Sequence, residues 1–187
     1  MKATLHGKLR DGRKRASGNS LEKKRMPKEF NGGSLNLEAR MLLHRTRDVL
    51  FRCEDRVVGE FGLTAEQYTV LTAMKHLNAP IRPTDVSRWV DHKVHTVSMI
   101  VDRMVRAGLL ERIRDLPDRR EVRLVITRRG EKALQPATAA ASKLIDEILS
   151  PLSPEDTRTL VKLLQTLRDK AHEHLISANG DSGNSGL

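Results

Sequence analysis

Residues 109–126, with the sequence LLERIRDLPDRREVRLVI, constrain the fold more than any other stretch of the chain. Apolar and charged residues alternate on both sides of a turn that contains Pro117 and Asp118. Alternation at period two is typical of a half-buried strand, and proline followed by aspartate favours a turn. The segment therefore predicts a β-hairpin, whose inward face would carry Val122, Leu124 and Ile126.

Two helical patterns precede this hairpin. The apolar spacing predicts one helix over residues 83–90 and another from about 95 to 107, separated by a polar turn around Asp91 and His92. Gly108 then ends the second helix. Helix, turn, helix and hairpin in this order predict a winged helix-turn-helix unit of the kind that binds DNA. In the second helix and just after it, the expected core residues are Val97, Ile100, Met104 and Leu109.

Residues 62–130 resemble the multiple antibiotic resistance regulator (MarR) family of bacterial transcription factors. The matching pieces are LTAEQYTVL at 63–71, Ser87, IVDRMVRAGLLER at 100–112, DRR at 118–120 and VITRRG at 125–130. Each piece is common alone, and their order and spacing carry the resemblance. The resemblance implies a homodimer that pairs through its first and last helices, binds a pseudo-palindromic operator and represses transcription.

Basic charge is concentrated in two segments. The chain carries a net charge of +10, of which residues 1–30 contribute +7 and residues 82–130 contribute +5. Residues 1–33 lack apolar periodicity, which predicts a disordered basic arm. The arm is either a solvated extension, with Met26 as an alternative start, or a source of sequence-independent DNA affinity. Residues 177–187 are also expected to be a disordered tail.

Long amphipathic helices flank the winged helix. In residues 34–61 the apolar side chains recur at helical spacing, and Ser153-Pro154 followed by two acids is a strong helix start. Residues 131–176 should thus form the C-terminal helices, with a kink at Pro136. The apolar stripes have little intrachain core to cover them, so we expect a homodimer. The domains expected are a winged helix at 62–130 between dimerisation helices at 34–61 and 131–176.

The second helix of the helix-turn-helix should place its N-terminal residues at base edges. The candidates are Lys93, His95, Thr96, Ser98 and Met99, with Arg103 as a phosphate contact. In the wing, the resemblance implies that Arg120 enters the minor groove and that Asp118 helps to hold it, with Arg119 as the reserve candidate. Alternatively, these charged side chains belong to an ordinary solvated surface and do not contact DNA.

Tyr68 and Trp89 are the two residues weighed for an effector pocket. Many members of the resembled family bind small aromatic or anionic effectors in the cleft between the winged helix and the dimerisation helices. The alternative to a pocket role is that Tyr68 is a core residue and that Trp89 only covers part of a helix. Cys53 lies on the apolar stripe of its helix and is expected to be a buried structural thiol.

The sequence argues against several function classes. His92 and His95 near Asp91, and His172 with His174, lack the thiols or further ligands of a metal site, so neither metal nor cofactor is expected. Neither a nucleophile–base pair nor a phosphate loop is apparent, so no enzyme is expected. The chain lacks an apolar run of about 20 residues and the apolar core of a signal peptide, which favours a cytoplasmic protein without membrane contact.

A mainly α chain with a small β-hairpin wing is therefore expected to be a sequence-specific DNA-binding transcriptional regulator. The alternative is an architectural or protein-interaction winged helix that contacts DNA without sequence preference. Competition by unrelated DNA separates these two functions.

Overall fold

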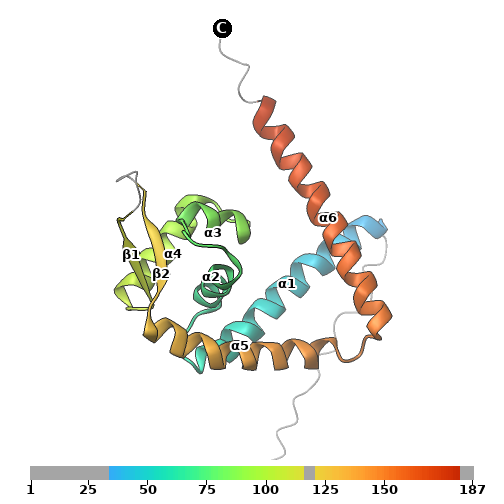
Figure 1. Cartoon of the computed structure of the whole chain (residues 1–187). Helices are drawn as coiled ribbons and strands as arrows, with labels where there is room; N and C mark the ends of the chain where they lie inside the picture. Colours follow the sequence, from blue (N-terminus) through green and yellow to red (C-terminus); the bar gives the residue numbers. More distant parts are fainter. Residues whose placement is uncertain (1–33, 116–120, 182–187) are drawn as a thin grey trace, which may run out of the picture. The chain divides into compact units, whose positions relative to one another are not determined.

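The computed structural model describes residues 34–115 and 121–181 (Figure 1). The order of elements is α1 (Leu35–Gly59), α2 (Ala65–His76), α3 (Pro83–Trp89), α4 (Val94–Arg106), β1 (Leu110–Ile113), β2 (Arg123–Ile126), α5 (Arg128–Leu149) and α6 (Pro154–Asp181). The predicted fold class, mainly helical with one small hairpin, is confirmed. The expected arm at 1–33, the wing tip at 118–120 and the end of the tail lie outside the described residues. None of the described helices is long and apolar enough to cross a membrane.

Packing divides the chain within α1, between Met41 and Leu42. The described part of the first unit is the beginning of α1, where Leu37 and Glu38 donate their backbone N–H groups to the Ser34 carbonyl. The second unit, from Leu42 onward, contains the hydrophobic core.

The core of the second unit joins α2, α3, α4 and the hairpin. Its fully buried side chains include Leu71, Val86, Met104 and Leu110. The four positions expected to be core from the α4 pattern are all buried, namely Val97, Ile100, Met104 and Leu109. The helix-turn-helix therefore has the apolar interior that its spacing predicts.

The hairpin has the register that its alternation requires. β1 and β2 are antiparallel, and Leu110 lies opposite Ile126 while Arg112 lies opposite Leu124. Leu124 is buried, and Ile126 packs partly buried against the core. The Leu124 N–H donates to the Ile81 carbonyl at 2.8 Å, which ties β2 to the segment before α3.

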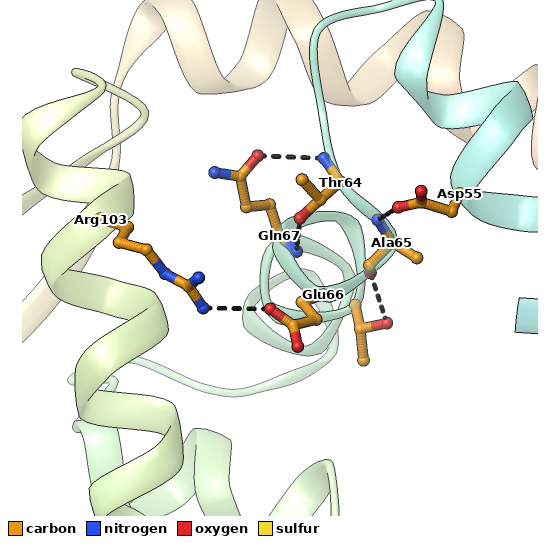
Figure 2. A network of polar contacts seen from close by, with 7 residues as sticks. Asp55, Thr64, Ala65, Glu66, Gln67 and Arg103 are labelled. Atoms are coloured by element: carbon orange, nitrogen blue, oxygen red, sulfur yellow. Dashed lines mark hydrogen bonds and ion pairs between the residues drawn. The ribbon is translucent and has the colours of Figure 1, made fainter. Parts of the chain in front are cut away.

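The start of α2 is fixed by three hydrogen bonds (Figure 2). The Thr64 hydroxyl accepts from the Gln67 backbone N–H at 3.2 Å, and the Gln67 side chain accepts from the Thr64 N–H at 3.0 Å. This reciprocal pair is a capping box. The Asp55 carboxylate accepts the Ala65 N–H at 2.8 Å, so the C-terminal part of α1 is hydrogen-bonded to the first turn of α2.

The C-terminal helices differ from the expected bounds at both ends. α5 begins at Arg128, where Thr127 caps it by accepting the Gly130 N–H at 3.0 Å, and it continues through Pro136 to Leu149. Proline removes one donor there, but the helical turns on both sides keep their own hydrogen bonds. α6 continues to Asp181, beyond the end expected at residue 176, so residues 177–181 are helical and not a loose tail.

Candidate nucleic-acid interface

The outer face of α4 is a stripe of exposed side chains. His95, Met99, Asp102 and Arg106 follow one another at helical spacing, on the side opposite the buried Val97, Ile100, Val101 and Met104. Met99 is 53% exposed, although an apolar side chain of this size gains free energy from burial. The stripe therefore presents an imidazole, a thioether and a guanidinium together for contact with another molecule.

The N-terminus of α4 has no side-chain cap and no acidic residue in its first turn. Side chains accept hydrogen bonds from first-turn N–H groups in three other helices, where the caps are Thr64 for α2, Thr127 for α5 and Ser153 for α6. The unpaired N–H groups of a helix start carry partial positive charge and attract anions. The first turn of α4, with Lys93 before it, is thus open to a phosphate or a base edge.

One carboxylate interrupts the exposed stripe of α4. Asp102 forms an ion pair with Arg112 of β1. The pair ties the hairpin to α4 and offsets the negative charge that would otherwise face a polyanion. The guanidinium of Arg112 is therefore paired within the protein.

Arg103 points toward α2 (Figure 2). Its guanidinium donates to the Glu66 carboxylate at 3.1 Å. On the α4 wheel Arg103 lies beside the stripe of His95 and Met99, and its ion pair orients α4 against α2. A phosphate contact by Arg103 would have to compete with Glu66.

The base of the wing holds two further ion pairs. Arg123 donates two hydrogen bonds of 2.6 Å to Asp115, and Arg82 donates to Glu121 at 2.7 Å. The hydrogen bonds from Arg123 lower the pKa of Asp115 below its ordinary value. These pairs fix the two ends of the hairpin that flank the wing tip. Asp118, Arg119 and Arg120 lie outside the described residues, so their predicted roles stay predictions.

The turn between α3 and α4 is held from both sides. Asp91 has a positive φ of 55°, a conformation that aspartate tolerates better than most residues. Its carboxylate lies 3.1 Å from Nε2 of His172 on α6. The His92 N–H donates to the Ser87 carbonyl at 3.0 Å, which closes the turn. No group of three metal-ligating side chains occurs among the residues that the structure describes.

Tyr68, Trp89 and Cys53 have different environments. Tyr68 is 9% exposed and belongs to the core cluster, which confirms the core interpretation. Trp89 is 45% exposed and stacks on His76, with ring centroids 5.8 Å apart and planes at 4°. Cys53 is a free thiol that is half-buried on α1, less buried than its place on the stripe predicted.

The last helix exposes several large apolar side chains. Leu164 and Leu167, on the stripe predicted for dimer contact, are 44% and 52% exposed. Val161, Leu163, Leu175 and Ile176 are exposed as well. Contiguous apolar surface of this kind marks an interaction site.

Sequence comparison matches part of this chain to one family. Residues 61–121 match the model of the MarR family. The transcriptional regulator PecS of Dickeya dadantii is 26% identical over 137 residues, which cover 72% of this chain and 80% of PecS.

Two solved structures share the fold. The ligand-free organohalide-sensing regulator RdhR has a TM-score of 0.70 and 22% identity, over 77% of this chain and 85% of that one. MepR of S. aureus, solved as a DNA complex, has a TM-score of 0.62 and 20% identity, over 75% of this chain and 99% of that one. Residues 61–121 of this chain are therefore similar to the MarR family of transcriptional regulators, and the chain shares the fold of these two solved regulators.

Proposed function

We propose that the protein is a homodimeric, sequence-specific DNA-binding regulator that inserts α4 into the major groove of a pseudo-palindromic operator. This proposal rests on the N-terminus of α4, which has no side-chain cap and lies beside the exposed stripe of the same helix. Lys93, His95, Thr96 and Ser98 offer polar groups to base edges and phosphates, and Met99 offers an apolar contact to a thymine methyl group. The DNA complex of MepR, which shares this fold, supports the proposal.

The homodimer is the second part of the proposal. The exposed leucines of α6 would be buried if α6 packed against the same helix of a second copy of the chain. Such an interface is self-complementary, as two-fold symmetry requires. Two-fold symmetry of the protein would match two operator half-sites, about one helical turn of DNA or a multiple of it apart.

The wing and the regulatory effect complete the proposal. Arg120, held by Asp118 and with Arg119 as the reserve candidate, enters a narrow minor groove beside each half-site. Bound dimers block polymerase access, which makes the protein a repressor. A small aromatic or anionic effector releases them, as the existence of a 2,4-dichlorophenol-bound form of RdhR suggests by analogy. Trp89, which is exposed, stays the effector contact proposed from the sequence, whereas Tyr68 belongs to the core.

Selection of DNA from a random pool by the purified full chain tests this function. We expect a two-fold symmetric motif whose inner positions change for His95→Ala and Met99→Ala. His174→Ala is the matched control for His95→Ala, because it removes an exposed imidazole from α6 and should leave the motif unchanged. Arg120→Ala should weaken operator binding by about 1–3 kcal/mol and reduce the preference for A·T-rich flanks.

The alternative, a winged helix without sequence preference, predicts a different outcome. The selected pool would then show no motif, and unrelated DNA would compete as well as any selected sequence. That result would exclude the proposed operator recognition.

A further inference from the structure

The last turn of α4 carries a cation on the side of the helix proposed for DNA. Arg103 follows Met99 by four residues and Thr96 by seven, so the three side chains lie along one side of α4. The Arg103 side chain is 58% exposed. A guanidinium can donate two parallel hydrogen bonds to phosphate oxygens. The position of Arg103, taken alone, therefore favours a contact with the DNA backbone.

Glu66 occupies this guanidinium in the free protein. Arg103 donates to the Glu66 carboxylate at 3.1 Å, and Figure 2 shows its side chain reaching from α4 to the first turn of α2. The Glu66 side chain is 47% exposed, so the pair faces water and any polyanion that approaches α4. Exposed pairs contribute little to stability. The pair therefore matters more for the charge that α4 presents than for the fold.

Both helix ends that carry the pair have other stabilising groups. The N-terminus of α2 is held by the capping box of Thr64 and Gln67 and by the hydrogen bond from the Ala65 N–H to Asp55. Arg103 lies in the last turn of α4, where the helix dipole stabilises a cation without any partner. Loss of the Glu66 carboxylate should thus leave both helices folded and release the Arg103 guanidinium.

We propose that Glu66 forms an autoinhibitory contact, which keeps Arg103 from binding a DNA phosphate. Phosphate contacts carry no sequence information, whereas the N-terminal half of α4 is the part assigned to base edges. Restraint of Arg103 lowers the affinity for every DNA sequence alike and leaves discrimination to residues 93–99. This inference rests on the proposed insertion of α4 into the major groove.

The salt dependence of DNA affinity tests the proposal, because it counts the phosphates that a protein neutralises. Fluorescence anisotropy of the full chain measures binding to the selected operator and to random duplex DNA. We expect Glu66→Gln to bind both DNAs more tightly at low salt and to steepen the log–log slope by about 0.9 per chain. A fourfold rise in salt should then weaken Glu66→Gln about 3.5-fold more per chain than the wild type.

Two further variants separate the released cation from the lost carboxylate. Arg103→Gln alone should keep the wild-type slope, because Arg103 does not contact DNA while Glu66 holds it. The double variant Glu66→Gln/Arg103→Gln should lose the steeper slope of Glu66→Gln. These two slopes also decide the matter if Glu66→Gln alone proves unstable in thermal melting.

Glu131→Gln is the matched control. It breaks the pair between Lys75 of α2 and Glu131 of α5, which has a similar exposure of 52% and 45% and a distance of 2.8 Å. The released Lys75 belongs to neither α4 nor the hairpin. The charge of the chain changes by the same amount as in Glu66→Gln, so the slope should stay at the wild-type value.

Four results would overturn the autoinhibitory contact. They are an unchanged slope in Glu66→Gln, a lower slope in Arg103→Gln alone, equal steepening in Glu131→Gln, or weaker DNA binding by Glu66→Gln, as expected if the pair only orients α4. Selection from a random pool should return the wild-type motif for Glu66→Gln. A retained motif with an unchanged slope rejects the Glu66 contact alone, whereas the absence of a motif for the wild type rejects operator recognition itself.

Discussion

Gly130, in the first turn of α5, sits where no side chain fits. A Cβ atom at this residue would lie 2.4 Å from the Leu109 carbonyl oxygen and 2.8 Å from Cγ2 of Ile126. The same carbonyl accepts the Thr127 N–H at 3.1 Å, so it is held in place by the backbone that leads into α5. Gly130→Ala must therefore push the first turn of α5 away from the start of β1.

The cost of Gly130→Ala has opposing parts. Overpacking a tight contact costs about 1–3 kcal/mol, and weakening the Thr127 hydrogen bonds to Gly108 and Leu109 adds about 1 kcal/mol. Alanine in a helix gains about 0.5–1 kcal/mol over glycine. The expected net effect is a loss of about 1–3.5 kcal/mol in the free energy of unfolding.

Gly59→Ala is the matched control. Gly59 ends α1 with nothing within 4 Å of an added Cβ and without a positive φ, so the same change should stabilise by about 0.4–1 kcal/mol. Urea denaturation followed by circular dichroism measures both variants, at several protein concentrations, because a dimer unfolds in a concentration-dependent way. Equal stabilities of Gly130→Ala and Gly59→Ala would refute the steric argument.

Three further predictions concern other parts of the chain. Leu164→Asp should dissociate the proposed dimer in sedimentation experiments, because a charge left unpaired in the dimer interface costs several kcal/mol; a variant that stays dimeric would show that α6 is not the interface. Burial raises the pKa of Glu54, so the stability linked to its protonation is present at acidic pH and is lost as pH rises through the raised value. Glu54→Gln should thus raise the melting temperature at neutral pH but not at acidic pH, and an equal gain at both pH values would contradict this. Deleting residues 1–33 should flatten the salt dependence of DNA affinity, by about 0.9 in log–log slope for each phosphate that the arm neutralises, and an unchanged slope would mean that the arm does not engage DNA.

The sequence predicted the elements whose pattern is local. Alternation at residues 109–126 indicated both strands, and the spacing of Val97, Ile100 and Met104 identified the buried face of α4. Side-chain periodicity alone decides such faces, because each element buries one side. The order of helices and strands, which is that of a winged helix-turn-helix, was then enough to propose that the opposite side of α4 contacts DNA.

The pairing of charges could not be predicted in the same way. Arg103 and Glu66 are 37 residues apart, and Arg82 and Glu121 are 39 apart, so only the packing of α2, α4 and the hairpin brings them together. The sequence therefore treated Arg103 as a phosphate contact, and it had no signal for Glu66.

α2 connects the parts of the second unit through polar contacts on three sides. Asp55 of α1 accepts the Ala65 N–H, Glu66 pairs with Arg103 of α4, and Lys75 pairs with Glu131 of α5. Exposed ion pairs each contribute about 0–1 kcal/mol, so the buried face of α2 supplies the stability and the pairs set its orientation.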